Sequence, residues 1–106
     1  MSKHTLAELP VKEPVAGFRG RFVNTPTMTL AYWKIKEGAT LPEHVHPHEQ
    51  VLNVIRGTLE LTIGGAVHQL HAGMVYAIPG DVPHAARAVT DCYVIDVFHP
   101  VREDYQ

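Results

Sequence analysis

The sequence predicts a single all-β domain with antiparallel strands, on the strength of two features. Short apolar segments alternate with turn-forming residues through residues 17–106, and no long stripe with helical periodicity interrupts them. The chain has 106 residues, of which 45% are apolar and 19% charged, as expected for one ordinary globular domain. We expect a barrel or a two-layered sandwich, because either arrangement protects the edges of a sheet with this many strands.

The turn residues divide the chain into elements. Residues 1–16 contain Pro10 and Pro14 among residues of mixed polarity, which predicts an irregular N-terminal arm before one domain of residues 17–106. Gly64-Gly65 fits the two-residue turn of a hairpin, and the other boundaries carry Gly, Pro, Asn or Asp, which form turns readily. The expected strands are residues 18–23, 28–36, 41–46, 50–56, 58–63, 66–70, 74–78, 84–89 and 92–98.

The last expected strand, residues 92–98, is apolar on both of its faces. Tyr93, Ile95 and Val97 lie on one face by alternation, and Cys92 and Val94 on the other. A strand that is buried on both sides needs a second sheet on one side and a partner or lid on the other. We therefore expect a homodimer.

Composition excludes several classes of protein. The formal net charge is −2, which argues against a nucleic-acid binder that acts through bulk positive charge. We expect no membrane span, because no run of about 18 apolar residues occurs. The first residues lack the apolar core and cleavage site of a secretory signal, and Cys92 is the single cysteine. These features predict a cytoplasmic protein.

Eight histidines are the unusual feature of the composition, and they are densest in residues 44–50 (HVHPHEQ). Pro47 argues against a helix here. In a strand, His44 and His46 point to the same face, where two imidazoles can share one metal ion. The alternative is that these side chains are polar residues of a solvated loop.

The spacing around these histidines resembles the first motif of the cupin family. Gly38 is followed after five residues by His44-x-His46, then after three residues by Gln50 and after six by Gly57. The resemblance implies a jelly-roll β-barrel with a metal ion inside its mouth.

The second cupin motif is present in part. Gly73, Pro79 and His84 fit it, whereas Asp81 replaces a glycine and Ala88 an asparagine. The resemblance implies that one divalent metal ion, which could be zinc, nickel, iron or manganese, is held by His44, His46, Gln50 and His84.

Glu49 is the rival to Gln50 as a metal ligand, but a shift of one residue turns a strand side chain to the opposite face. Three neutral imidazoles and a neutral amide leave the full charge on a divalent ion, which strengthens it as a Lewis acid. This ligand set favours hydration, isomerisation or proton transfer over oxygen activation. His48 is expected at the rim of the site.

Asp96 is a charged residue inside the apolar final strand, where an unpaired charge is costly. It shares a face with Phe98, and Arg102 follows six residues after it. An arginine at the mouth of a barrel can hold a substrate carboxylate through two N–H groups. The alternative is a structural salt bridge between Asp96 and Arg102, or an Arg102 that lies on a solvated tail.

The histidine segment and the ending Asp96–Asp104 together resemble the small cupins of pectin and alginate degradation, which linearise 4,5-unsaturated monouronates to keto sugar acids. The resemblance implies an anionic sugar-acid substrate, with Asp96, Phe98 and Arg102 as the catalytic residues. Two other functions stay open: a metal-dependent dioxygenase, and a non-catalytic module that binds or senses a small ligand. Trp33 is expected in the core or in a dimer interface rather than at a ligand.

Overall fold

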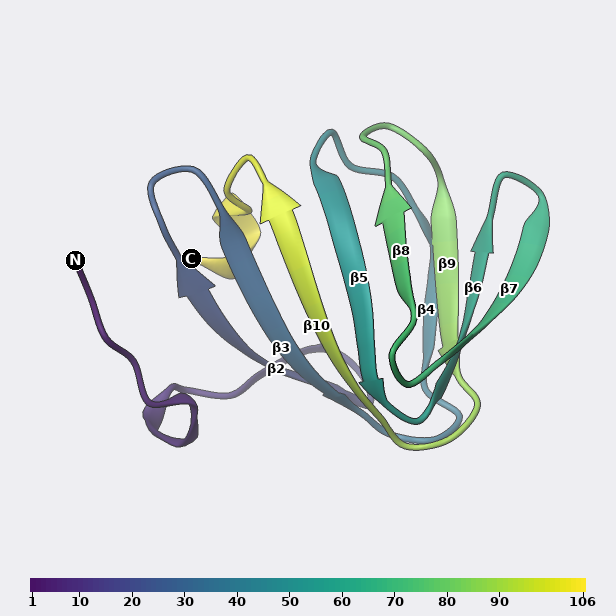
Figure 1. The fold of residues 1–106 in the computed structure, drawn as a ribbon, viewed down its shortest axis with the longest axis horizontal. Helices are drawn as coiled ribbons and strands as arrows, with labels where there is room; N and C mark the ends of the chain where they lie inside the picture. Colours follow the sequence, from purple (N-terminus) through teal and green to yellow (C-terminus); the bar gives the residue numbers. More distant parts are fainter.

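The computed structural model describes residues 1–106 as ten strands in two antiparallel sheets (Figure 1). The six-stranded sheet has the order β1 (Lys12–Val15), β2 (Phe18–Asn24), β3 (Thr29–Ile35), β10 (Cys92–His99), β5 (Glu49–Arg56), β8 (Val75–Ile78). The four-stranded sheet has the order β4 (Thr40–His44), β9 (His84–Ala88), β6 (Thr58–Ile63), β7 (Ala66–His71). Two short 3₁₀ turns, Leu6–Glu8 and Glu103–Tyr105, lie near the two ends of the chain. The all-β jelly-roll architecture expected from the sequence is confirmed.

All nine expected strands are present, as β2 to β10, with boundaries that differ by at most two residues. The difference lies in the N-terminal arm, where residues 12–15 form β1 rather than irregular chain. This strand pairs with β2 only at Lys12 and Val15, and the register shifts between these pairs. Pro14 is tolerated because β1 is an edge strand. The sequence does not predict this strand, because three of its four residues are exposed and show no apolar alternation.

The core lies between the two sheets and is built by alternation along the strands. Fifteen buried apolar residues form one cluster, and Leu59 and Leu61 of β6 face Val54 of β5 and Val94 of β10 from the opposite sheet within it. Burial of these side chains is the main driving force for closing the sheets on each other. The chain contains no helix with the length and apolar character that crossing a bilayer requires.

Strand β10 runs through the middle of the six-stranded sheet, between β3 and β5. Asp96 lies opposite Ala31 of β3 and Leu52 of β5, and both of these neighbours are buried. Asp96 and Phe98 therefore point between the sheets. Gln50 at the start of β5 lies opposite Phe98, which brings it to the same end of the barrel.

Candidate metal centre and active site

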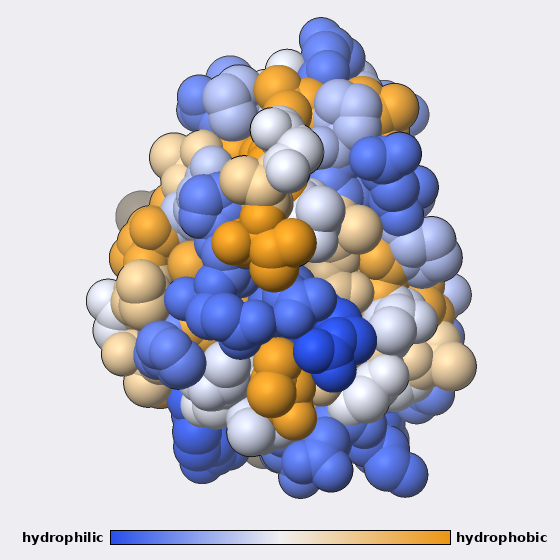
Figure 2. Space-filling model, turned by 90° about the vertical axis from the view of Figure 1, so that its right-hand side faces the viewer, coloured by the Kyte–Doolittle hydropathy of each residue, from blue (hydrophilic) through white to orange (hydrophobic).

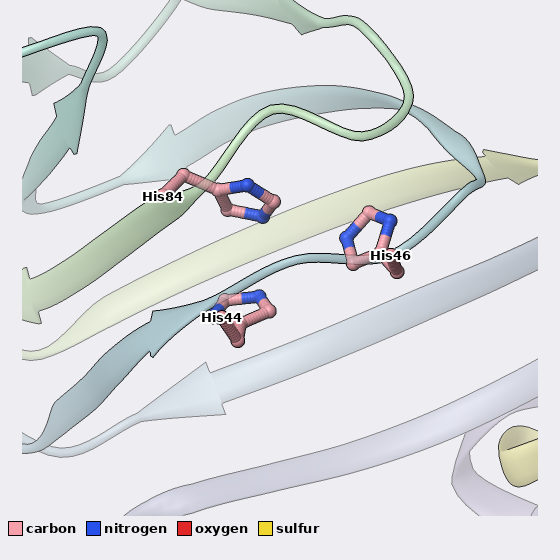
Figure 3. Close-up of side chains that lie close together, drawn as sticks. All are labelled: His44, His46 and His84. Carbon is pink, nitrogen blue, oxygen red and sulfur yellow. The ribbon is translucent and has the colours of Figure 1, made fainter.

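Three histidines from two separate segments meet at one end of the barrel (Figure 3). His44 ends β4 and lies directly opposite His84, which begins β9. His46 follows in the loop after β4. One potential ligand atom from each histidine lies within 4.8 Å of the other two.

Close backbone packing fixes the two loops that carry these histidines. The backbone N–H of Asp81 donates to the carbonyl of His46 at 2.9 Å. A Cβ atom at Gly80 would lie 2.3 Å from the carbonyl oxygen of Pro47, so only glycine permits this approach. The Pro-Gly-Asp turn thus holds the segment of His46 against the segment of His84.

Hydrogen bonds to backbone carbonyls orient all three imidazoles. The Nδ1 atoms of His44, His46 and His84 lie 2.9, 3.0 and 2.8 Å from the carbonyl oxygens of Pro42, His48 and Val82. Because a carbonyl only accepts, each Nδ1 carries a proton, and Nε2 is the ring nitrogen left to offer a lone pair to a metal ion. Metal-binding histidines are oriented in this way. The Nε2 atom of His84 is buried and has no hydrogen-bond partner, as expected of an atom that coordinates a metal ion.

The site favours neutral histidines. Burial is the main factor that lowers the pKa of His46 to about 4, and the charges of Arg102 and His84 lower it further. Burial likewise lowers the pKa of His84. Both rings are therefore neutral at neutral pH, which is the form that binds a metal ion.

Gln50 is buried beside His46, whereas Glu49 is exposed. The Gln50 Oε1 atom lies 3.2 Å from His46 Nε2. The single ring proton of neutral His46 lies on Nδ1, which donates to the carbonyl of His48. The contact between His46 Nε2 and Gln50 Oε1 therefore brings two lone pairs together. A cation bound by both atoms would turn that repulsion into attraction. The four residues expected to bind metal are thus brought together, with Gln50 and not Glu49 facing the histidines.

Asp96 is buried next to this group and accepts two hydrogen bonds. Gln50 Nε2 donates to its Oδ1 at 2.9 Å, and Trp33 Nε1 donates to its Oδ2 at 3.1 Å. Burial raises the pKa of Asp96 to about 6, although both hydrogen bonds and the charge of Arg102 oppose the rise. Trp33 is a core residue, as expected, but its contact with Asp96 was not anticipated. The contact could have been inferred because a buried indole N–H needs an acceptor, and Asp96 is an acceptor expected on an inward face.

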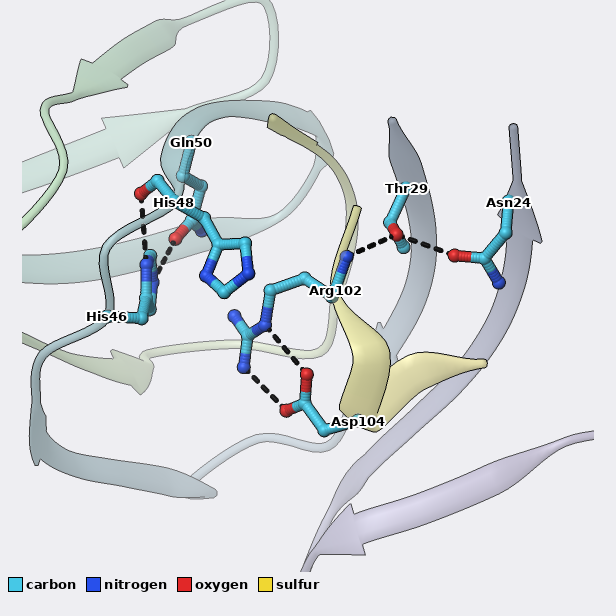
Figure 4. Close-up of polar contacts among 7 residues, drawn as sticks. All are labelled: Asn24, Thr29, His46, His48, Gln50, Arg102 and Asp104. Carbon is cyan, nitrogen blue, oxygen red and sulfur yellow. Dashed lines mark hydrogen bonds and ion pairs between the residues drawn. The ribbon is translucent and has the colours of Figure 1, made fainter. Parts of the chain in front are cut away.

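Arg102 is held at the mouth of the barrel by residues of the C-terminal segment (Figure 4). Its Nε and Nη2 atoms donate to the two carboxylate oxygens of Asp104 at 2.9 and 2.7 Å. Its guanidinium carbon lies 4.8 Å from the centre of the Phe98 ring and 4.5 Å from that of Tyr105. The backbone N–H of Arg102 donates to Thr29 Oγ1.

The structure therefore shows neither alternative for Arg102, a salt bridge with Asp96 or a position on a solvated tail. The carboxylate that pairs with Arg102 is Asp104, not Asp96, and the arginine side chain is only 12% exposed rather than solvated. Sequence reasoning missed Asp104 and Tyr105. The available signal was an acidic residue two positions after Arg102. It lies in the 3₁₀ turn Glu103–Tyr105, which brings its carboxylate to the guanidinium.

Comparison with known families identifies the fold. The model of the family described as "Cupin domain" matches residues 31–98. This chain is a cupin.

Two solved structures resemble the cupin over nearly its whole length. KdgF from Halomonas sp. is 28% identical, with a TM-score of 0.92 and coverage of 100% of this chain and 99% of that chain. An RmlC-like cupin from Shewanella frigidimarina is 26% identical, with a TM-score of 0.92 and coverage of 99% and 97%. The resemblance inferred from sequence motifs is thus confirmed as a KdgF-like cupin. No curated protein matches the chain by sequence.

A more distant relative shares the fold alone. Oxalate decarboxylase OxdC from Bacillus subtilis is 18% identical, with a TM-score of 0.81 and coverage of 92% of this chain and 29% of that chain. An identity this low carries no information about the reaction.

The interior of this cupin contains a cavity of about 250 Å³, enough for a small molecule. Most of its wall is apolar and includes Trp33, Leu52 and Phe98, whereas its polar groups are few. The polar lining residues are His44, Gln50, His84, Asp96, Arg102 and Asp104. A cavity with apolar walls and a few convergent polar groups is typical of a small-molecule site.

Proposed function

We propose that this cupin holds one divalent metal ion through His44, His46, Gln50 and His84 and converts 4,5-unsaturated monouronates to linear keto sugar acids. The observation that carries the proposal is the contact between Gln50 and Asp96, because it couples the candidate metal centre to a buried carboxylate in the same cavity as Arg102. The motif resemblance to the cupins of pectin and alginate degradation supports the choice of substrate.

The donor set fits a divalent ion, because one ring nitrogen of each histidine lies within 4.8 Å of the other two and the Gln50 amide oxygen lies beside His46. Zinc, nickel, iron and manganese all accept such ligands. When bound, the ion would polarise oxygen atoms of the substrate.

Asp96 is proposed to move the proton. The conversion is an isomerisation: the bond between C1 and the ring oxygen breaks, the anomeric hydroxyl loses a proton and C4 gains one. A carboxylate whose pKa is raised to about 6 exchanges protons readily near neutral pH. Its two hydrogen bonds, from Gln50 and Trp33, fix the orientation of its oxygens.

Arg102 and Phe98 are proposed to hold the sugar acid. Arg102 has N–H donors left after it pairs with Asp104, and they suit a substrate carboxylate. Phe98 is buried beside His46, with 5.8 Å between the ring centres, and provides an apolar wall that excludes water. Because Cys92 is a free, buried thiol, we also propose a reducing, cytoplasmic setting.

The test is to incubate metal-analysed protein with an unsaturated galacturonate monomer and follow the loss of ultraviolet absorbance from its conjugated double bond. We expect fast loss with the wild-type protein, and loss near the spontaneous rate with chelated protein and with Asp96→Asn. Glu49→Gln is the matched control, because Glu49 is exposed on the opposite face of the strand.

A spontaneous rate with the metal-loaded wild-type protein would reject this substrate. Oxygen consumption by the ferrous protein would then favour the dioxygenase function, and binding of a sugar acid without turnover would favour the sensing module. An oxygen electrode measures the oxygen consumption, and calorimetry measures the binding without turnover.

A further inference from the structure

Thr29 is a buried polar residue that the proposed reaction does not use. Five buried residues are polar or charged, and four of them belong to the candidate site: His46, Gln50, His84 and Asp96. Thr29 is the fifth and is completely buried, although it does not line the cavity. Because burying a hydroxyl is costly unless it is hydrogen-bonded, the partners of Thr29 indicate its role.

The strand register places Thr29 in line with the site. Phe98 of β10 lies opposite Thr29 of β3 on one side and opposite Gln50 of β5 on the other. Asn24, at the end of β2, lies opposite Thr29 in turn. This row crosses four neighbouring strands at the end of the barrel that carries the histidines. Thr29 thus links the site to the tip of the hairpin formed by β2 and β3.

The hydroxyl of Thr29 uses both of its hydrogen-bonding functions (Figure 4). It accepts from the backbone N–H of Arg102 at 2.8 Å and donates to Asn24 Oδ1 at 2.5 Å. The other half of the Asn24 amide is also bonded, because its Nδ2 donates to the carbonyl of Tyr105 at 3.1 Å. Asn24 and Thr29 together thus hold the C-terminal segment at two points, one on each side of Asp104.

These two bonds are the main polar attachment of the C-terminal segment. Three hydrogen bonds join residues 101–106 to the rest of the chain, and the third comes from the exposed side chain of Lys12. Tyr105 also stacks on the ring of Phe22, which anchors the far end of the segment but not the backbone of Arg102. The hydroxyl of Thr29 is therefore the one buried contact that fixes that backbone.

We propose that Asn24 and Thr29 are positioning residues for the sugar acid, because they fix the backbone of Arg102 so that its guanidinium lines the cavity. The inference rests on the proposed function, in which Arg102 holds the substrate carboxylate. Asn24 and Thr29 do not line the cavity, so they act through Arg102. Holding a long side chain in place before the substrate binds lowers the entropy that binding costs. Loss of this support should therefore weaken substrate binding more than it slows the chemical step.

The first measurement is the order of the Arg102 side chain in the metal-free full chain, which requires neither substrate nor activity. Nuclear magnetic relaxation of the Arg102 Nε–H group gives its order parameter. We expect a value near that of a rigid backbone, about 0.85, in the wild-type protein and in Thr29→Ser, which keeps the hydroxyl. In Thr29→Val the value should fall below about 0.6.

The second measurement is steady-state kinetics of the metal-loaded protein with the unsaturated galacturonate monomer. Thr29→Val should raise KM about tenfold, the order of one hydrogen bond, and change kcat by less than about twofold. Thr29→Ser should recover the wild-type KM. An unchanged KM in a folded Thr29→Val protein, or a fall in kcat alone, would overturn the proposal.

Thr62→Val is the matched control, because it makes the same chemical change on the other sheet. Thr62 faces outward from β6, between Val67 of β7 and Ala85 of β9. Figure 2, which views the molecule from the side of β6 and β7, shows hydrophilic and hydrophobic residues interspersed, so another valine suits this surface. The order parameter of Arg102, KM and kcat should all keep their wild-type values.

Far-UV circular dichroism shows whether each variant folds. If Thr29→Val fails to fold, Asn24→Ala takes its place with the same expected results, because Asn24 is only half-buried at the end of β2. The two measurements also separate this inference from the proposed reaction. An inactive wild-type protein would reject the reaction alone. An Arg102 side chain that is as ordered in the folded variant as in the wild-type protein would reject the role of Asn24 and Thr29, whatever the reaction.

Discussion

The side chain of Gln50 joins the histidine cluster to Asp96. Its amide nitrogen donates to Asp96 Oδ1 at 2.9 Å, while its oxygen lies 3.2 Å from His46 Nε2. A glutamine amide offers an acceptor to one side and a donor to the other, whereas a glutamate carboxylate offers acceptors alone. This gives a physical reason for glutamine at a position where the cupin motif usually has glutamate.

Gln50→Glu should therefore separate metal binding from turnover. The carboxylate still offers an oxygen ligand but cannot donate to Asp96 unless it is protonated, so the two acids compete for one proton. We expect kcat to fall by about 100-fold, the low end of general acid–base contributions, with metal still bound. Metal analysis beside steady-state kinetics tests this. Equal activity in Gln50→Glu and wild-type protein would contradict it, and Glu49→Gln is the control.

His84→Ala should remove most of the bound metal. It deletes the buried Nε2 atom that has no other partner and leaves two histidines. We expect at least a tenfold loss of metal affinity, as for other changes around a metal centre. Mass spectrometry of metal content after dialysis measures this. His68→Ala is the control, because His68 packs against Tyr76 away from the site, and retention of full metal content by His84→Ala would disprove the ligand set.

Asp104→Asn should weaken substrate binding more than chemistry. Asp104 fixes the guanidinium of Arg102 through two charged hydrogen bonds, each worth about 1.5–3 kcal/mol. We expect KM for the sugar acid to rise about tenfold, as a loss of uniform binding does, and kcat to change little. Glu103→Gln, at the exposed neighbour, should leave both constants unchanged. An unchanged KM in Asp104→Asn would show that Arg102 needs no such support.

The stability of the metal-free protein between pH 6 and pH 4 should reflect the opposing effects of the buried histidines and Asp96. The pKa of His46 is lowered to about 4, so its contribution is lost as the pH falls from 6.5 towards 4. The pKa of Asp96 is raised to about 6, so its contribution grows as the pH falls through the same range. The lowered pKa of His84 adds to the loss from His46, and the contribution of Asp96 offsets part of this loss in the wild-type protein.

Asp96→Asn removes the second contribution and should make stability fall more steeply with acid. Urea unfolding at several pH values gives both slopes. If the variant and the wild-type protein show parallel curves, the raised pKa of Asp96 is wrong. Val67→Ala, at an exposed site on β7, provides the reference for a variant without a titration effect.

Leu61→Ala should destabilise the fold through its core. Leu61 is completely buried in β6, and such truncations cost about 2–5 kcal/mol because they leave a cavity. Val67→Ala should change stability by less than about 0.5 kcal/mol, because Val67 is exposed. Chemical denaturation measures both, and similar losses would contradict the assignment of the core.

Local patterns predicted most of this fold. Alternation located β2 to β10, and turn residues separated them, because both signals act between near neighbours in the chain. The edge strand β1 could not be predicted, since its pairing depends on β2 rather than on its own exposed residues.

The site was predictable where spacing carries information and not where contacts are long-range. The histidine spacing pointed to His44, His46 and His84, which the structure brings together. The bond between Trp33 and Asp96 joins residues 63 positions apart, and no local pattern encodes it. The hydrogen bond from the Arg102 backbone to the Thr29 hydroxyl joins residues 73 positions apart and is equally hidden from local patterns.

The length of strand β10 is fixed by the side chains that it must direct inward and outward. Ile95 faces outward and Asp96 inward, so a deletion or insertion of one residue before them would exchange their positions and place an isoleucine beside Gln50. Changes of length are therefore confined to the turns, such as the Gly64-Gly65 turn between β6 and β7. That turn is a place to insert a peptide tag or a fluorescent label, since it is exposed and open space surrounds both glycines.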